Sequence, residues 1–544
     1  MSLFGNLYVG NSGLQTSQNA LNTVAHNLTN VDTKGYTRQQ VAQSDRTYNT
    51  ISINASIVSN KQTGLGTYYS ETRQVRDYFL DQTYREENGR LSFYNLTYNT
   101  FKEVENTLGE LDGESFNDSL SQFWESIEEL AKEPSSSVKQ GLFIQRASQF
   151  LTRAKAVYTD LSQMQDNLNK QVKDDIDRVN EISKRIYELN NNILKIECAG
   201  VEQANDLRDE RNALLDELGG LMNISYKEDV DGAVMIKAEG HALVTRGAYY
   251  DMALFADPSN GLYTPYWRQD AGFDEAGNPD LTNCRVFDLT LPISTARNTD
   301  IGGIKAELLA RGDSRANYTY LDKPDYNQTT AQSVIMNVQA EFDSLIHSVV
   351  TKVNEVFAQS ADKDNGYLVD KNGNPIQIFQ KIASDGYDAA GNYIAEDPTE
   401  EKGTTLYTVA NLTINPDLMK QATLIGLVKP DQKEDFELIK KLQDVFTTED
   451  YVLNPNVVTK TNLIDFYSNL VSQIGSSGSV FKSVYNNQET TVNSTEFARQ
   501  QVVGVSDDEE LNNMIKFQNA YNANSRFINT VNEMIEHIIN TLAV

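Results

Sequence analysis

The chain has 544 residues, of which 76 are acidic and 47 are basic, so its formal net charge at pH 7 is −29. This excess of carboxylates argues against nucleic acid and anionic membrane surfaces as partners, because both repel a strongly acidic protein. At roughly 150 residues per domain, the length predicts about three or four domains.

The N-terminus carries no basic stretch followed by an apolar run, and no run of about eighteen apolar residues occurs anywhere in the chain. We therefore expect neither a cleaved secretory signal nor a transmembrane helix. The two cysteines, Cys198 and Cys284, are too few for a disulfide framework and are expected to be free thiols. Composition alone favours the cytoplasm, unless an export route that needs no cleaved signal carries the protein out.

Both chain ends carry apolar residues at a heptad spacing, which is typical of a coiled-coil seam. The N-terminal seam consists of Leu14, Leu21, Val24, Leu28 and Val31. The C-terminal seam consists of Met514, Phe517, Tyr521, Ile528, Val531, Ile535, Ile538 and Leu542.

Helix start and stop signals accompany these seams. Ser506 followed by Glu509 predicts a capping box, Ser12 with Gln15 is its weaker version, and Gly35 suits the residue that ends a helix. An isolated helix of this length is marginal in water, because fixing each backbone residue costs about 1–2 kcal/mol. We expect both ends to be poorly ordered in the free monomer and to fold against neighbouring subunits. The alternative is an intramolecular pair of the N- and C-terminal helices.

The interior alternates between helical and strand-like periodicity. An apolar stripe from Leu161 to Ile196 predicts one long helix, and residues 205–218 predict an amphipathic helix whose charges form a structural network rather than a catalytic site. Further helices are predicted at residues 304–310, 333–357, 434–445 and 463–474.

Alternating residues after Met222 and turn signals such as Asn372–Gly373 predict two β-rich insertions. We therefore predict a multidomain α+β protein, a long helical-bundle or coiled-coil rod formed by both chain ends, with β-rich inserted domains. The predicted domains are a terminal coiled-coil assembly domain (1–40 with 505–544), a helical rod domain (41–222 with 301–358 and 430–504), a β-rich inserted domain (223–300) and a second one (359–429).

The sequence predicts no catalytic, cofactor-binding or metal-binding residues. The histidines at positions 26, 241, 347 and 537 stand far apart, and no motif of a metal site, a phosphate-binding loop or a nucleophile elbow occurs. Residues 362–366 (DKDNG) weakly suggest a calcium loop, but no Glu closes the loop at its twelfth position, so we predict a hairpin turn. A hydrolase housed in a β-rich insertion remains the enzyme alternative.

Motifs at both ends resemble those of a known family. Residues 12–14 (SGL) and 27–36 (NLTNVDTKGY) resemble the N-terminal signature of bacterial flagellar rod, hook and hook-associated proteins, and residues 504–534 resemble their C-terminal signature. Residues 35–39 (GYTRQ) are similar to the hook-associated proteins of the first hook–filament junction layer, as are several interior segments. The chain departs from the common N-terminal pattern at His26, Thr29 and Lys34.

This resemblance implies a structural axial protein of the flagellum, exported unfolded by the flagellar type III apparatus and polymerised outside the cell as an adaptor at the hook–filament junction. The implied partners are further copies of the chain in a helical ring, the hook protein below, a second junction protein (hook-associated protein 3) above, and a cytoplasmic export chaperone on the C-terminal helix. A head-to-tail contact repeated on a helical lattice would make the two seams the assembly interface. A flagellar hook protein, another junction protein and a cytoplasmic coiled-coil scaffold are the alternatives.

Overall fold

A computed structural model describes residues 3–54, 59–109, 115–200, 202–275, 277–384, 386–388, 390–400 and 403–542. The side chains of residues 50–54, 59–61 and 542 lie outside the described part, and Leu542 of the predicted seam is among them. Within these residues, no helix is long and apolar enough to cross a membrane. The multidomain α+β class predicted from the sequence is confirmed.

The chain forms two compact units. Unit 1 contains residues 1–91, 177–251 and 488–544, and unit 2 contains residues 92–176 and 252–487. Three helices contribute residues to both units: α2 (Tyr78–Leu108), α4 (Ser137–Glu197) and α10 (Leu463–Val503). The division into four domains predicted from periodicity stays a prediction.

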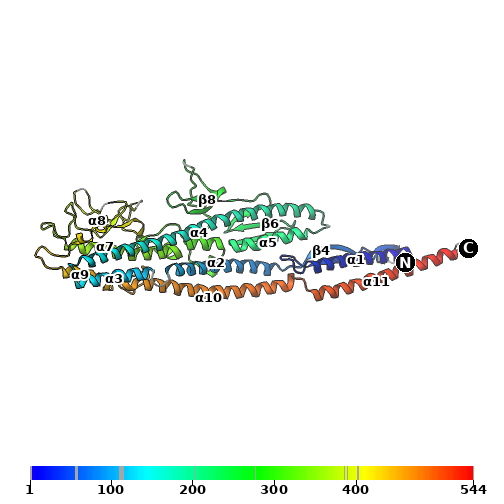
Figure 1. The fold of residues 1–544 in the computed structure, drawn as a ribbon. Helices are drawn as coiled ribbons and strands as arrows, with labels where there is room; N and C mark the ends of the chain where they lie inside the picture. Colours follow the sequence, from blue (N-terminus) through cyan, green and yellow to red (C-terminus); the bar gives the residue numbers. More distant parts are fainter. Residues whose placement is uncertain are drawn as a thin grey trace. The chain divides into compact units, whose positions relative to one another are not determined.

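In unit 1, the two terminal helices pack against each other (Figure 1). Helix α1 (Leu3–Thr29) contacts α11 (Asp507–Leu542) and also two antiparallel strands, β1 (Gln39–Asp45) and β4 (Thr67–Gln74). A second antiparallel pair joins β2 (Asn49–Asn54) and β3 (Ser59–Thr63).

These four strands lie within residues 41–222, apart from the start of β1, and that range was predicted to belong to a helical domain. The prediction was wrong for residues 41–74. Strands β1, β3 and β4 are largely polar and lack the alternating apolar pattern that marks a half-buried strand, whereas Ile51 and Ile53 of β2 do alternate and were a signal that the prediction missed.

The rest of unit 1 is built on α4 and α5 (Asn205–Leu221) beside a three-stranded antiparallel sheet (Figure 1). Its strands are β5 (Ile224–Glu228), β6 (Val234–Ala238) and β7 (His241–Val244). In the central strand, alternate residues are buried, as expected for a strand with one covered face. Asn190 of α4 fixes this strand by donating to the Val234 carbonyl (2.8 Å) and accepting from the Val234 amide (3.1 Å).

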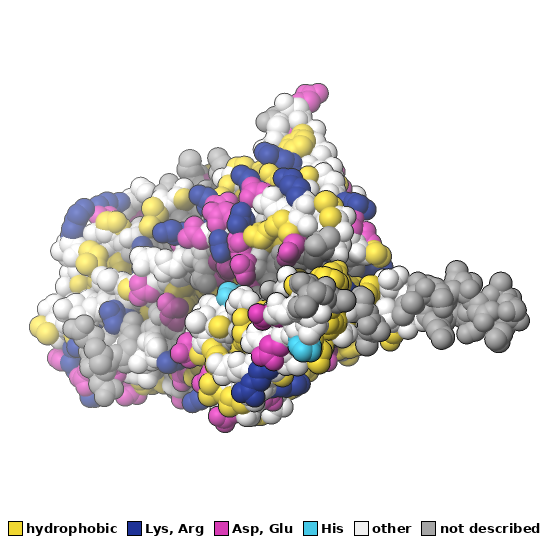
Figure 2. Space-filling view, turned by 90° about the vertical axis from the view of Figure 1, so that its right-hand side faces the viewer, with side chains coloured by type: hydrophobic (Ala, Val, Ile, Leu, Met, Phe, Trp, Pro, Cys, Tyr) yellow, Lys and Arg dark blue, Asp and Glu magenta, His cyan; other side chains and the backbone are white. Residues whose placement is uncertain are grey.

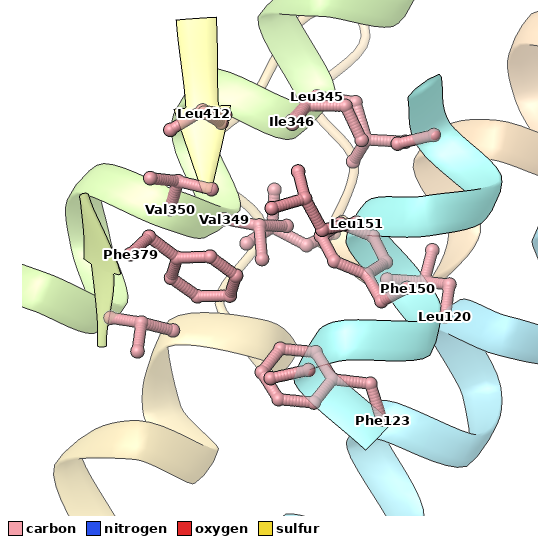
Figure 3. Close-up of a cluster of buried hydrophobic side chains, with 14 of the residues drawn as sticks. Leu120, Phe123, Phe150, Leu151, Leu345, Ile346, Val349, Val350, Phe379 and Leu412 are labelled. Atoms are coloured by element: carbon pink, nitrogen blue, oxygen red, sulfur yellow. The ribbon is translucent and has the colours of Figure 1, made fainter. Parts of the chain in front are cut away.

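Unit 2 contains the larger core (Figure 3). Side chains from α3, α4, α7 and two short strands meet there, among them Phe123, Phe150, Val349 and Phe379, and each of these four has no exposed surface. The helices and strands of unit 2 not yet named are α3 (Phe116–Lys132), α6 (Gly303–Arg311), α7 (Val334–Ser360), α8 (Pro416–Lys420), α9 (Phe436–Thr447), β8 (Met252–Ala256), β9 (Tyr263–Trp267), β10 (Phe379–Lys381) and β11 (Leu412–Ile414). Short 3-10 helices are η1 (Arg268–Asp270), η2 (Thr295–Arg297), η3 (Tyr318–Tyr320), η4 (Tyr326–Gln328), η5 (Thr330–Gln332), η6 (Val409–Asn411) and η7 (Ala422–Ile425).

The helices predicted inside the chain are present, but one is much longer than predicted. The stripe of α4 is buried from Leu161 to Ile193, as its periodicity indicated. Helix α10 was predicted to end near residue 474 and continues to Val503. Its second half is rich in Asn, Gln, Ser and Thr, so no continuous apolar stripe marks it in the sequence.

The second predicted β-rich insertion, residues 359–429, is mostly turns and loops. Among its described residues, β10 and β11 are the only strands, and each has three residues. The turn signals themselves are correct: Asp370 and Asp388 each accept from the amide of the Asn four residues on (2.9 and 2.8 Å), and a glycine with positive φ precedes that Asn. Turn chemistry is local, whereas a strand needs a partner segment with matching apolar residues, which these hairpins lack.

Residues 362–366 form a hairpin turn, as predicted. The Asp362 carboxylate accepts from the amides of Asp364 (3.1 Å) and Asn365 (3.2 Å), so it is occupied by its own loop. In the part of the chain that the structure describes, no group of three or more His, Cys, Asp and Glu side chains could hold a metal ion.

Candidate assembly interface

The terminal helices run antiparallel and approach closely at two glycines of α1. Gly10 lies beside Ile528, and a Cβ atom added to Gly10 would come within 2.8 Å of the Ile528 side chain. A Cβ atom on Gly13 would come within 2.7 Å of the Asn524 amide. Because the contacts on α11 move toward its N-terminus as those on α1 move toward its C-terminus, the two chain ends form one antiparallel pair.

This pair is intramolecular, so the arrangement in the structure is the alternative to a seam formed only between subunits. Of the predicted N-terminal residues, Val24 is buried, Leu14, Leu21 and Leu28 are half-buried, and Val31 is exposed beyond the end of α1. Of the C-terminal residues, Val531 is buried, Ile538 is exposed, and Met514, Phe517, Tyr521, Ile528 and Ile535 are half-buried. The heptads therefore mark residues at the helix pair without being fully covered by it.

The most buried positions of α1 are mostly small or polar, and the heptad analysis missed all of them except Val24. They are Gly10, Ser12, Thr16, Ser17, Ala20, Val24 and Asn27. The hydroxyls of Thr16 and Ser17 donate hydrogen bonds to backbone carbonyls of the same helix, those of Ser12 (2.9 Å) and Gly13 (2.8 Å). Small residues whose hydroxyls are hydrogen-bonded within their own helix let a neighbouring helix approach closely. The recurrence of Gly, Ser and Ala through α1 was the signal that could have revealed this face.

The terminal helices also present large apolar side chains that the described residues leave between 39% and 74% exposed. Ile515 is 58% exposed and Leu511, one turn before it, is 48% exposed. The other members of this set are Phe4, Tyr8, Phe527, Met534, Ile538 and Ile539. Exposed apolar surface of this extent marks an interaction site.

A polar joint fixes the register of the two ends. The buried Asn27 side chain uses its whole amide: Nδ2 donates to the Gln39 carbonyl (2.9 Å) and to the Glu510 carboxylate (3.1 Å). Its Oδ1 accepts from the Tyr36 hydroxyl (2.7 Å) and the Gln39 amide (3.0 Å). Burial, with the nearby carboxylates of Asp209, Asp206 and Glu510, raises the pKa of Tyr36, so its hydroxyl stays a donor.

Arg38 ties the segment after α1 to the start of α11. Its Nε donates to Glu510 (2.9 Å), a terminal nitrogen pairs with Glu509 (2.9 Å), and its backbone amide donates to the Val503 carbonyl (2.9 Å). Glu510 is only 2% exposed, so this ion pair is buried and its loss would leave an uncompensated charge. The Glu509 carboxylate pairs with Arg38 instead of taking part in the predicted capping box with Ser506.

A second polar layer attaches α5 to the same joint. Asp209 accepts from the Thr37 hydroxyl (2.5 Å) and from Gln74 Nε2 (2.7 Å), while Arg76 contacts Asp81 through two nitrogens at 2.9 Å. Burial raises the pKa of Asp209 to about 6, and the hydrogen bonds from Thr37 oppose that rise. The charges of residues 205–218 therefore form a structural network, as predicted, and the arrangement holds segments together rather than building a reaction site.

The chain matches three family models. They are the flagellar hook-associated protein FlgK helical domain over residues 101–286, the flagella basal body rod protein over residues 7–37, and the flagellar basal body rod FlgEFG protein C-terminal over residues 501–541. The two shorter matches cover most of α1 and α11, the helices that pair in unit 1.

Relatives of the same kind align over almost the whole chain. Flagellar hook-associated protein 1 of Bacillus subtilis (strain 168) is 25% identical, covering 100% of this chain and 99% of the relative. Flagellar hook-associated protein 1 of Escherichia coli (strain K12) is 23% identical, with 97% of this chain and 98% of the relative covered. The flagellar hook junction protein FlgK from Burkholderia pseudomallei has a similar fold, with a TM-score of 0.53 and 12% identity over 78% of this chain and 100% of that one.

Proposed function

We infer that this chain belongs to the flagellar hook-associated protein 1 family and is a structural component of the flagellar axis at the hook–filament junction. The observation that carries this proposal is the pairing of α1 with α11, since the two helices matched by axial-protein models lie together and leave large apolar side chains exposed. A protein that acts alone in solution has no use for that surface, whereas a subunit of a polymer covers it with its neighbours.

We propose that the chain polymerises as an adaptor ring, with the two terminal seams and the exposed apolar residues of α1 and α11 as its assembly interface. Burying a side chain such as Ile515 against a neighbour would contribute about 1.5–3 kcal/mol, and a ring repeats each contact in every subunit. The terminal assembly domain of this proposal comprises residues 1–40 and 505–544.

The proposed partners are those of a ring that lies between the hook and the filament. Further copies of the chain lie beside it, the hook protein below and the second junction protein above, all outside the cell. A cytoplasmic chaperone is proposed to cover α11 before export, because Met534 and Ile539 near its end are exposed and would otherwise invite aggregation. Export by the flagellar type III apparatus would need no cleaved signal. The proposal assigns no enzymatic reaction to the chain.

Deletion of the gene tests the place of the protein in the flagellum. Cells are examined by electron microscopy and the flagellin released into the medium is measured. Bare hooks with flagellin released as monomer are expected, because the export channel is complete and only the adaptor is missing. Cells without hooks would move the assignment to the hook itself, and normal filaments would overturn the flagellar role.

Ile515→Asp tests the proposed interface without disturbing the monomer. Ile515 is 58% exposed, so the variant should fold and be exported normally but fail to restore filaments in the deletion strain. Asn519→Asp, four residues on and also exposed, introduces the same carboxylate beside that position and serves as the matched control. Full restoration by Ile515→Asp would exclude this surface from assembly.

A further inference from the structure

A cavity of about 310 Å³ opens in unit 1 between the end of β4, the start of α2, α5 and β5. Four arginines line it, at positions 73, 76, 85 and 208, against two carboxylates, Asp81 and Glu228. This composition is unusual in a chain whose net charge is −29. Figure 2 shows acidic, basic and apolar side chains interspersed on the face that it presents, so strongly charged sites on this protein are local.

Three of the arginines have partners in unit 1. Arg76 pairs with Asp81 at 2.9 Å and Arg208 with Glu197 at 2.8 Å. Arg85 donates to Asp216 at 2.7 Å, and its guanidinium carbon lies 4.5 Å from the centre of the Tyr226 ring. The fourth, Arg73, is exposed and has neither an ion pair nor a side-chain hydrogen bond within the described ranges.

Aromatic side chains at the same cavity add a second unsatisfied group. The Tyr226 hydroxyl is buried and has no hydrogen-bond partner among the described residues, although Tyr78 donates its own hydroxyl to the Tyr226 carbonyl at 3.0 Å. Phe79, whose ring centre lies 6.0 Å from that of Tyr78, is 77% exposed. A buried hydroxyl without a hydrogen-bond partner is costly to the folded chain.

Tyr78, which is 46% exposed, lines the same cavity as Arg73. An exposed aromatic ring together with an arginine is the composition of a binding hot spot in protein interfaces. A carboxylate is the acceptor that a guanidinium such as that of Arg73 binds most strongly, because the hydrogen bonds between them are assisted by charge. The name Arg73 patch is used for Arg73, Tyr78, Phe79, Arg85 and Tyr226.

We propose that the Arg73 patch docks the acidic start of helix α11 of a second copy of this chain, with Asp507 and Asp508 of that copy facing Arg73. Residues 507–510 are the only run of more than two consecutive acidic residues in the sequence. Glu509 and Glu510 are paired with Arg38, whereas Asp507 and Asp508 are exposed and make no ion pair within the described ranges. Each copy therefore offers a cationic side chain at Arg73 and an acidic pair at Asp507 and Asp508, none of which has an ion pair within the described ranges.

Two different patches that complement each other on the same chain produce a head-to-tail contact, which propagates around a ring or along a helix. The inference rests on the proposed function, because it names a lateral contact between the subunits of the proposed ring. The inference concerns residues outside the terminal seams, so an experiment can contradict the inference without contradicting the proposed function.

Charge reversal tests the pairing in the deletion strain. Arg73→Glu should lower the number of cells with filaments about tenfold, because like charges would then face each other at every subunit contact. The variant Asp507→Lys with Asp508→Lys should be similarly defective. Combining all three substitutions should restore filaments, because the charges are exchanged rather than removed. Lys227→Glu is the matched control: Lys227 is exposed and adjacent to Tyr226 on β5, where successive side chains point to opposite faces.

Export of each variant should equal that of the parent, and so should the thermal unfolding of purified Arg73→Glu, since Arg73 makes no ion pair within the described ranges. The variant with Asp507→Lys and Asp508→Lys should be only slightly less stable to thermal unfolding, because both positions lie in the first turn of α11, where positive charge is unfavourable. A normal Arg73→Glu strain would overturn the inference, and if Ile515→Asp still abolished filaments in the same strain, the proposed function would stand without it. The pairing of Arg73 with Asp507 and Asp508 would be refuted if Arg73→Glu and the double lysine variant were both defective and exported, and the variant with all three substitutions still formed no filaments. Normal filaments in the deletion strain would instead remove the proposed function itself.

Discussion

Asn27 and Glu510, which are 483 positions apart in the sequence, are joined by a hydrogen bond of 3.1 Å in the interior of unit 1. The bond connects the last turn of α1 to the first turn of α11, and the same Asn27 amide holds the backbone of Gln39. A single side chain thus sets how the two chain ends meet and where the chain turns after α1.

Asn27→Ala should loosen this joint. The substitution removes the Asn27 hydrogen bonds to the Tyr36 hydroxyl, to both backbone groups of Gln39 and to one carboxylate oxygen of Glu510, whose other oxygen stays paired with Arg38. We expect a loss of about 2–4 kcal/mol in local stability. Hydrogen exchange of α1 and α11 measures that loss directly, because exchange reports the opening of separate segments. Asn22→Ala, at an exposed position of the same helix, should leave the exchange rates unchanged. Equal rates in both variants would show that the joint does not hold the pair.

Gly10→Ala should separate the terminal helices. The added methyl group would lie 2.8 Å from Ile528 and 3.0 Å from Phe527, so one helix must shift, at a cost of about 1–3 kcal/mol. Gly141→Ala in α4 is the matched control, because a Cβ atom there meets nothing within 4 Å and should stabilise the helix by roughly 0.5–1 kcal/mol. The rate of disulfide formation between cysteines introduced on α1 and α11 measures the distance between the two helices. An unchanged rate in Gly10→Ala would contradict the close approach.

Leu21→Asp tests how much of the N-terminal seam the intramolecular pair uses. Leu21 is half-buried, so a carboxylate there should open the α1–α11 pair while the core of unit 2, which contains none of its atoms, keeps its stability. Circular dichroism should show a folded protein, and protease digestion should cut the chain ends first. Assembly at the hook should also fail. Complete unfolding would instead indicate that the terminal pair supports the whole protein.

Glu307 should make the stability of unit 2 dependent on pH. Burial, with the charge of Asp175 and a hydrogen bond that the protonated Glu307 donates to that carboxylate, raises the pKa of Glu307 to about 9. The folded state therefore holds a proton that the unfolded chain releases near pH 4.5, so this stability is fully present below pH 4.5 and is lost as the pH rises toward about 9.

Glu307→Gln removes that dependence, because a neutral amide needs no proton. At pH 8 the variant should be more stable than the parent by on the order of 2 kcal/mol, with little difference at pH 4. Thermal unfolding across this pH range gives the comparison, and Glu103→Gln, at an exposed position of α2, is the control. Parallel pH profiles for the parent and Glu307→Gln would contradict the buried, protonated carboxyl.

Local features of this protein were determined by its sequence. The stripe of α4 is periodic, and its period reported which face of that helix is buried. The heptads of α1 and α11 marked both segments as helices, but most of their residues are only half-buried. Turns such as Asp388–Asn392 were equally visible, because the aspartate, glycine and asparagine act on their own backbone. Family motifs at residues 27–36 and 504–510 marked the right segments without revealing what their side chains do.

The tertiary structure alone decided which surfaces meet. The heptads did not show that α1 presents its small residues to its neighbours, nor that polar strands β1 and β4 lie beside it. The joint of Asn27, Arg38 and Glu510 and the protonated Glu307 were also invisible, since each depends on a group brought from a distant position. Burial of one face lowers the free energy of a helix whatever covers that face, so the apolar periodicity of a helix can be read from its own residues. The choice of partner depends on the difference in free energy between alternative contacts, and only the folded chain contains that comparison.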